Sequence, residues 1–124
     1  MRIGIPKEIK PLEGRVALVP EAAGELVRAG SEVYVQAGAG ERSGYPDSAY
    51  SAHGIQILPD AATLYGRAQL IVKVKEPIAP EYDLLRPEHV LFSYLHLAAV
   101  PELARVLQQK GLTALAFETV EVKG

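Results

Sequence analysis

The stretch Val90-Leu91-Phe92-Ser93-Tyr94-Leu95-His96-Leu97-Ala98-Ala99 decides the fold that we expect for this chain. It begins as a short apolar run with aromatic residues, which is typical of a strand buried in a sheet. It ends on a histidine shortly before Pro101, and proline commonly opens a helix. A side chain at such a junction lies at the carboxyl end of a strand, where ligands bind in open α/β sheets. His96 is therefore a candidate functional residue; the alternative is that it only packs or hydrogen-bonds beside the following helix.

The composition of the 124 residues is that of one ordinary globular domain. Hydrophobic residues make up 48% and charged residues 23%, and the formal net charge is −2. Acidic and basic residues interleave, so the charge pattern indicates neither a nucleic-acid partner nor a membrane surface. The chain has no cysteine, which excludes thiolate metal sites and a cysteine nucleophile and fits a reducing cytoplasm. We expect neither a signal peptide nor a membrane span, because every apolar run is too short.

Strand and helix patterns alternate along the chain. Five segments have strand character: residues 2–5, 32–36 and 70–75, the run through Phe92, and residues 112–117. Proline starts, glycine ends and helical spacing predict helices at 20–30, 46–54, 59–66, 80–85 and 101–110. Asp47 and Asp60 are available as caps. This alternation predicts an α/β fold with a doubly wound, mainly parallel sheet of about five strands.

Two loops have sequences that bear on a possible binding site. A polar loop from Lys7 to Arg15 follows the first strand and is expected to be exposed at the edge of the sheet. Gly38-Ala39-Gly40-Glu41-Arg42-Ser43-Gly44 has some likeness to a dinucleotide loop, but Tyr45-Pro46 interrupts the place where a phosphate-binding helix would begin. We interpret it as a plain glycine-rich turn and expect no cofactor-binding residue in this chain.

Arg15, Lys75 and His96 follow three of the predicted strands or lie in the loops after them. The segments that follow parallel strands emerge at the same edge of the sheet, so these three side chains could share one site. The alternative is that Arg15 and Lys75 are solvated surface charges, as most such residues are.

Five motifs carry a resemblance to a known family. They are Met-Arg-Ile-Gly-Ile-Pro-Lys-Glu at 1–8, Glu-Gly-Arg-Val-Ala-Leu-Val-Pro at 13–20, Lys-Val-Lys-Glu-Pro at 73–77, Tyr-Leu-His-Leu-Ala-Ala at 94–99 and Phe-Glu-Thr-Val at 117–120. Together they resemble the amino-terminal domain of bacterial alanine dehydrogenases, in the family that also includes the nicotinamide nucleotide transhydrogenases. The resemblance spans nearly the whole chain.

The resemblance implies a cytoplasmic, NAD-dependent homohexamer that interconverts L-alanine with pyruvate and ammonium. Residues 1–124 would be its Rossmann-like catalytic and substrate-binding domain, incomplete without a C-terminal return segment and inactive without the NAD-binding domain. Arg15 and Lys75 match the residues that bind the substrate carboxylate, and His96 matches the catalytic histidine. Glu118 would be a supporting carboxylate, and Glu8 and Glu13 match family positions that we expect to orient Arg15. No metal is implied.

Two other classes of protein remain open. The chain could be the equivalent domain of the alpha subunit of a proton-translocating transhydrogenase, or a non-catalytic oligomerisation or ligand-sensing module on the same fold. Lys75 and His96 match the dehydrogenases rather than the transhydrogenases. A glycine-fingerprint domain encoded after Gly124 would argue against the module.

Overall fold

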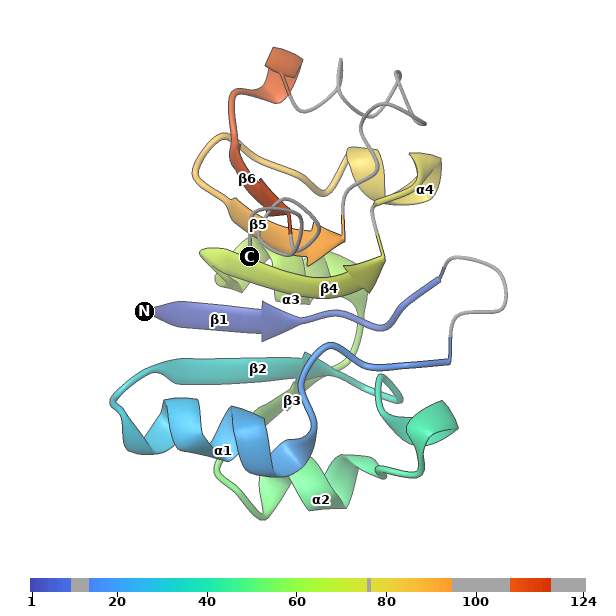
Figure 1. The fold of residues 1–124 in the computed structure, drawn as a ribbon, viewed down its shortest axis with the longest axis vertical. Helices are drawn as coiled ribbons and strands as arrows, with labels where there is room; N and C mark the ends of the chain where they lie inside the picture. Colours follow the sequence, from blue (N-terminus) through green and yellow to red (C-terminus); the bar gives the residue numbers. More distant parts are fainter. Residues whose placement is uncertain (10–13, 76, 95–107, 117–124) are drawn as a thin grey trace, which may run out of the picture.

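The computed structural model describes residues 1–9, 14–75, 77–94 and 108–116. In this part of the chain, six strands form one parallel sheet in the order β3-β2-β1-β4-β5-β6 (Figure 1). The strands are β1 (Arg2–Ile5), β2 (Glu32–Gln36), β3 (Gln56–Leu58), β4 (Leu70–Lys75), β5 (Val90–Tyr94) and β6 (Thr113–Ala116). The predicted α/β class and parallel sheet are confirmed, with one more strand than expected.

Helices cover both faces of the sheet, as a doubly wound fold requires. They are α1 (Pro20–Arg28), the 3-10 helix η1 (Glu41–Ser43), α2 (Asp47–Ser51), α3 (Ala61–Arg67) and α4 (Ala79–Tyr82). Helices α1 and α2 lie together beside β2 and β3, whereas α3 lies behind β1 and β4 in Figure 1. Residues 108–110 are also helical, and the rest of the helix predicted at 101–110 lies outside the described residues.

The period-two alternation of the strands divides the core into two hydrophobic clusters. Ile3, Ile5 and Val35 pack with Ala23 of α1 and Tyr50 of α2 on one face. The opposite face packs against α3 in a cluster of Tyr34, Leu58, Leu64, Tyr65, Ala68, Ile71, Leu85 and Leu91. Short parallel strands that are buried on both faces therefore need nearly continuous apolar sequence, which β1 and β4 have.

The predicted helix signals at α1 are confirmed. Pro20 is its first residue, and Gly30 has a φ of 104°, a left-handed conformation that glycine adopts without steric cost. Asp60 caps α3, because its Oδ1 accepts a hydrogen bond from the Thr63 N–H at 2.8 Å. Asp47, however, does not cap α2; its Oδ1 accepts a hydrogen bond from the Gly38 N–H at 2.9 Å. The predicted end of α3 at Gly66 is also wrong, because the helix continues to Arg67.

Strand β3 is absent from the strands expected from sequence. Its three residues, Gln56–Leu58, are too few to show a convincing alternation, and they lie between two helices that proline and glycine signals predict. The pairing of Tyr34 with Gln56 and of Gln36 with Leu58 makes β3 an edge strand beside β2. Tertiary pairing, rather than local sequence preference, therefore defines this strand.

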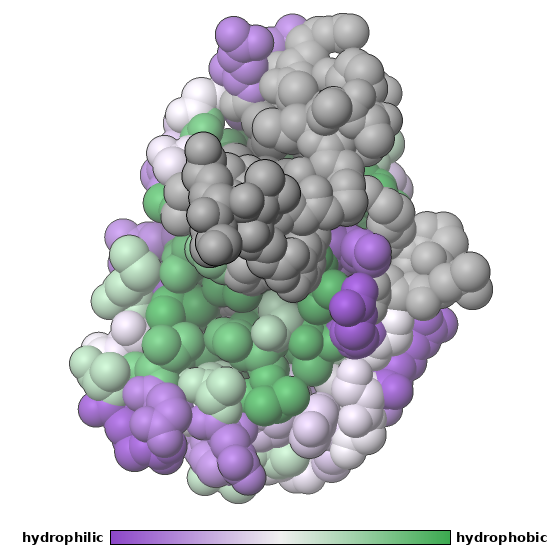
Figure 2. Space-filling view, in the orientation of Figure 1, coloured by the Kyte–Doolittle hydropathy of each residue, from purple (hydrophilic) through white to green (hydrophobic). Residues whose placement is uncertain are grey.

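The surface seen in Figure 2 has a hydrophobic patch over β1 and β2, and hydrophilic side chains gather where β1 and β4 end. Within the described residues, no helix has the length and apolar character that a membrane crossing needs. The polar end of the strands, rather than the apolar patch, is where the candidate site lies.

Candidate functional site

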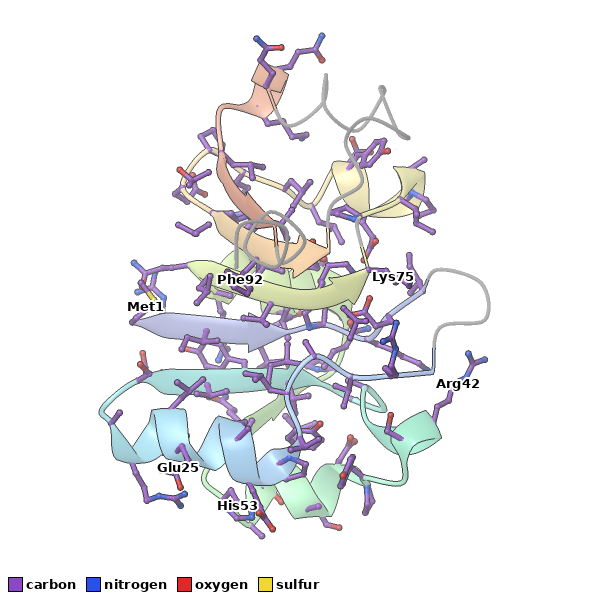
Figure 3. All side chains as sticks on the ribbon, viewed as in Figure 1. Met1, Glu25, Arg42, His53, Lys75 and Phe92 are labelled. Carbon is purple, nitrogen blue, oxygen red and sulfur yellow. The ribbon has the colours of Figure 1, made fainter. Side chains whose placement is uncertain are left out.

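The sheet reverses its direction of growth between β1 and β4. The chain leaves β1 toward β2 on one side, whereas β4 continues to β5 on the other. Ligands bind in parallel α/β sheets at such a switch point, in the crevice at the carboxyl ends of the two strands. Arg15 lies in the segment after β1 and Lys75 is the last residue of β4, which Figure 3 shows at the arrowhead of that strand. Their predicted placement at one edge is confirmed, while His96 and Glu118 lie outside the described residues.

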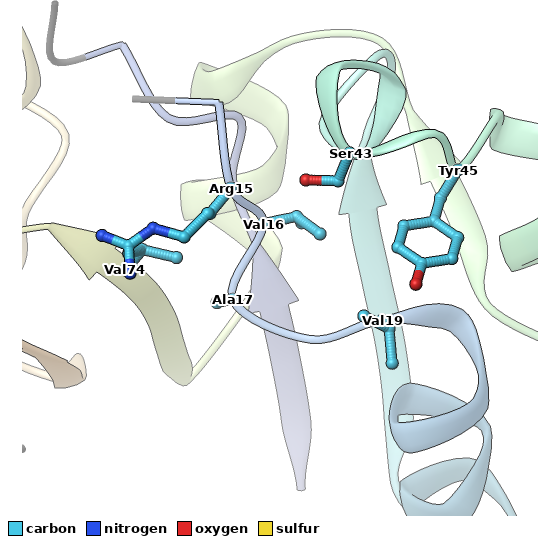
Figure 4. A pocket seen from close by; sticks show the side chains of 7 residues that line it. All are labelled: Arg15, Val16, Ala17, Val19, Ser43, Tyr45 and Val74. Carbon is cyan, nitrogen blue, oxygen red and sulfur yellow. The ribbon is translucent and has the colours of Figure 1, made fainter. Parts of the chain in front are cut away.

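A pocket of about 450 Å³ opens beside this crevice. It is lined by Arg15, Val16, Ala17, Val19, Ser43, Tyr45 and Val74 (Figure 4). The exposed Arg15 side chain points toward Val74 near the end of β4, away from Tyr45. The wall carries one guanidinium and the hydroxyl groups of Ser43 and Tyr45 among valine and alanine side chains. This combination suits a small organic anion, because a guanidinium binds a carboxylate with two parallel hydrogen bonds.

The end of β4 contains a β-bulge. Val72 pairs with Phe92 and Lys75 pairs with Tyr94, so three steps along β4 match two steps along β5. An extra residue bends the strand and redirects the side chains after it, and bulges are frequent beside active sites. The half-buried Lys75 therefore leaves the sheet in a direction that regular alternation from Ile71 would not give it.

A buried ionic cluster lies directly beside this bulge. The Lys73 ammonium donates to Glu8 Oε1 at 3.1 Å and to Glu81 Oε2 at 2.8 Å. The exposed fractions of the Lys73, Glu8 and Glu81 side chains are 1%, 2% and 5%. Glu8 also accepts hydrogen bonds from the backbone N–H groups of Val74 at 2.9 Å and Lys75 at 3.3 Å. The prediction that the loop from Lys7 is simply exposed is therefore wrong at Glu8, whose buried carboxylate binds the end of β4.

The cluster continues into the core through Tyr65. Its hydroxyl donates to Glu81 Oε2 at 3.4 Å, and burial, with the Glu81 and Glu8 carboxylates adding to it, raises the pKa of Tyr65 well above its usual value of 10. The hydroxyl therefore stays a donor at physiological pH. The buried His89 accepts at Nδ1 from the Arg86 N–H at 3.0 Å, so its Nε2 carries the proton and donates to the Tyr65 carbonyl at 2.7 Å. These bonds fix the neutral tautomer of His89 in a structural role.

The glycine-rich segment is a plain turn, as predicted. Gly38 has a φ of 80° and donates its N–H to Asp47, and a single 3-10 turn follows where a phosphate-binding loop would need an α-helix. This geometry does not fit the pyrophosphate of a dinucleotide. Across the described ranges, no three histidine, aspartate or glutamate side chains lie close enough together to hold a metal ion.

Sequence reasoning missed two members of the buried cluster, Lys73 and Glu81. A signal for Lys73 was present, because in Leu70-Ile71-Val72-Lys73-Val74-Lys75 a regular strand places Lys73 on the same face as Ile71. A lysine on a core face needs a buried carboxylate as its partner. Nothing local identified that partner, since Glu8 lies 65 residues away in sequence.

The chain is similar to alanine dehydrogenases along nearly its whole length. It is 49% identical over 120 residues to the alanine dehydrogenase of Bacillus subtilis, a match that covers 97% of this chain and 32% of that protein. It is 44% identical over 122 residues to the alanine dehydrogenase of Methanococcus maripaludis, covering 98% of this chain and 33% of that protein. The chain thus spans about a third of the length of these curated relatives.

Solved structures give the same picture. An L-alanine dehydrogenase matches with a TM-score of 0.93 and 47% identity, over 95% of this chain and 32% of that one. A transhydrogenase from Sinorhizobium meliloti matches with a TM-score of 0.88 and 34% identity, over 95% of this chain and 34% of that one. The family model described as the N-terminal domain of alanine dehydrogenase/PNT matches residues 4–124. The chain therefore belongs to the alanine dehydrogenase/PNT N-terminal domain family.

Proposed function

We propose that this chain is the substrate-binding domain of an NAD-dependent L-alanine dehydrogenase, which converts L-alanine, NAD and water to pyruvate, ammonium and NADH. The observation that carries the proposal is the position of Arg15 and Lys75 at the switch point between β1 and β4, in a chain 49% identical to an alanine dehydrogenase. Cationic side chains of this kind make the short, charge-assisted hydrogen bonds by which proteins bind carboxylates.

Arg15 and Lys75 bind the carboxylate of alanine or pyruvate in this proposal. The guanidinium of Arg15 supplies a planar fork that matches two oxygens, and the ammonium of Lys75 adds a compact charge. The two contacts hold the substrate carbon at a fixed distance from β4 and β5, which lowers the entropic cost of reaching the reactive geometry.

His96 carries protons in the same proposal. An imidazole with an unperturbed pKa near 6.5 can both accept and donate at physiological pH, as hydration of an iminium carbon and release of ammonia require. With pyruvate bound, its protonated ring would donate a hydrogen bond to the carbonyl oxygen and polarise the carbon for attack by ammonia. Glu118 is a candidate supporting carboxylate for this step.

NAD would be held mainly outside residues 1–124. The turn at Gly38 does not fit a dinucleotide, and the relatives of this chain are about three times its length. NAD supplies the hydride acceptor; this domain binds the substrate, orients it and exchanges its protons. We further propose that the intact protein is a cytoplasmic homohexamer without a nucleic-acid or membrane partner, as its family resemblance suggests.

The corresponding transhydrogenase domain is the second candidate. Its fold match is also close, with a TM-score of 0.88, but its sequence identity is lower at 34%. Hydride transfer between two nucleotides needs no clamp for a substrate carboxylate, so Arg15 and Lys75 together favour the dehydrogenase.

The test is an assay of the full-length protein that contains this chain. We expect NADH to form from NAD in the presence of L-alanine, and NADH to be consumed with pyruvate and ammonium. Hydride transfer between NADH and an NADP analogue without alanine-dependent turnover would support the transhydrogenase. The absence of both activities from a folded protein would leave the non-catalytic module.

A further inference from the structure

The backbone at the end of β4 extends past its neighbour in the sheet. The register of β1 against β4 runs through Ile3 with Leu70 and Gly4 with Ile71, and β1 ends at Ile5. The next residue is the buried Pro6, which has no N–H. Strand β4 continues to Lys75, so its last N–H groups need an acceptor other than β1.

The side chain of Glu8 takes the place of the missing strand. Its Oε2 accepts from the Val74 N–H at 2.9 Å and its Oε1 from the Lys75 N–H at 3.3 Å. These are the N–H groups of the bulged segment that redirects Lys75. One carboxylate therefore holds two consecutive residues of the bulge in place.

Two further side chains hold Glu8. The Lys73 ammonium bridges Glu8 Oε1 and Glu81 Oε2, and Glu81 Oε1 accepts from the Ile78 N–H at 3.0 Å. A buried cluster of this kind contributes little net stability, because the cost of removing its charges from water offsets their attraction. What it does supply is a fixed geometry, which ties the segment after β1 to β4 and to α4.

We propose that Glu8 is a positioning residue for substrate binding, with Lys73 and Glu81 as its supports. By fixing the backbone of Val74 and Lys75, it aims the Lys75 ammonium at the substrate carboxylate. This inference rests on the proposed function, in which Lys75 binds that carboxylate. Glu8 and Arg15 also line one small cleft of about 10 Å³, so the positioning residue lies beside the other cation of the clamp as well.

The primary test is Glu8→Gln in the full-length protein. An amide has one acceptor oxygen for three donors, the Lys73 ammonium and the N–H groups of Val74 and Lys75, and its own NH₂ faces one of them. We expect the KM for pyruvate to rise about tenfold, the scale of one lost charge-assisted hydrogen bond, with a smaller change in kcat. Hydrogen exchange at the Val74 and Lys75 amides should quicken in the variant.

A double-mutant cycle distinguishes an effect of Glu8 on the position of Lys75 from a general disturbance of the fold. In a Lys75→Ala background, Glu8→Gln should change the KM for pyruvate by less than about twofold, because the ammonium that it positions is gone. Equal penalties in both backgrounds would overturn the proposal. Asp60→Ala is the matched control, since it removes the cap of α3 without touching the cluster and should lower thermal stability but leave the KM unchanged.

A second variant covers the case in which Glu8→Gln does not fold. Combining Glu8→Gln with Lys73→Met and Glu81→Gln removes all three buried charges together, while the amide oxygen at position 81 can still accept from the Ile78 N–H. It should show the same rise in KM. If wild-type protein turns over alanine and these variants keep a normal KM, the inference fails and the proposed function stands. If wild-type protein has no alanine turnover, the proposed function fails and this role of Glu8 with it.

Discussion

Lys73 Nζ lies 2.8 Å from Glu81 Oε2, and neither side chain is more than 5% exposed. Because this ammonium also bonds Glu8, removing it would leave two carboxylates buried without their shared cation. The fold therefore depends on Lys73 in a way that a strand residue between two valines does not suggest.

The first prediction concerns Lys73→Met. It should lower the free energy of unfolding by about 3–5 kcal/mol, because breaking a buried pair leaves uncompensated charge. Urea unfolding of wild type and variant under the same conditions measures this. Arg28→Ala is the control, because its ion pair with Glu25 is exposed and should contribute no more than about 1 kcal/mol. Similar losses of unfolding free energy in both variants would show that Lys73 in the buried cluster contributes no more to stability than an exposed ion pair does.

The second prediction compares two glycines. A Cβ at Gly4 would lie 2.7 Å from the Ala68 Cβ and 3.0 Å from a Leu64 methyl group, so Gly4→Ala should push α3 from the sheet and cost about 1–3 kcal/mol. A methyl group added at Gly66 in α3 would instead lie 3.8 Å from its nearest neighbour, an Arg86 nitrogen. Gly66→Ala should stabilise the protein by about 0.5–1 kcal/mol through helix propensity. Thermal unfolding of the two variants should move in opposite directions.

The third prediction concerns alkaline pH. Burial, with Tyr45 and Asp47 adding to it, raises the pKa of Tyr50 to about 12, while an unfolded tyrosine ionises near 10. The native state keeps this proton longer, so its contribution to stability is complete below pH 10 and is lost as the pH rises from 10 through 12. Tyr50→Phe should flatten the fall of stability over that window. An unchanged pH dependence in the variant would contradict the shift; tyrosinate absorbance and unfolding midpoints give the two readings.

The fourth prediction tests the carboxylate clamp. In the full-length protein, Arg15→Lys keeps the charge but loses the bidentate geometry. The variant should lose about 2 kcal/mol of transition-state stabilisation, measured as a lower kcat/KM for pyruvate. Arg28→Lys is the control and should leave kcat/KM unchanged, because Arg28 lies exposed in the last turn of α1 and pairs with Glu25. If Arg15→Ala and Lys75→Ala kept the kcat and KM of the wild type, both residues would be surface charges without a role in substrate binding.

The fifth prediction concerns His96. In the full-length protein, His96→Ala should lower kcat by a factor of about 10² to 10⁴, the range of general acid–base catalysis, with NADH binding nearly unchanged. The ionisation limb that His96 gives to the pH profile should disappear with it. A variant that keeps this limb and a near-normal kcat would move the proton carrier to another part of the protein.

The fold was largely predictable from local signals. Pro20 and Gly30 mark α1, Asp60 caps α3, and apolar runs mark the central strands, since each signal acts within a few residues. Strand β3 was missed because only its pairing with β2 makes its three residues a strand. The parallel arrangement followed from the alternation of strands and helices, which leaves few other topologies.

The candidate site was predictable only in part. The position of Arg15 and Lys75 at one edge of the sheet was predictable because the carboxyl ends of parallel strands share that edge, an argument that needs only strand order. Their role in substrate binding stays a prediction. The buried role of Glu8 depends on contacts with Lys73, 65 residues away in sequence, and with the Val74 N–H beyond it. No periodic pattern encodes such a contact, and the bulge that makes it possible is itself a tertiary feature.

The central position of β1 has a consequence for how the protein folds during synthesis. Strand β1 leaves the ribosome before both of its neighbours and pairs on one side with β2 but on the other with β4, and the contact of Arg2 with Gln69 already spans 67 residues. Until β4 has emerged, one edge of β1 and its apolar residues stay without a partner, and such open edges attract chaperones or other nascent chains.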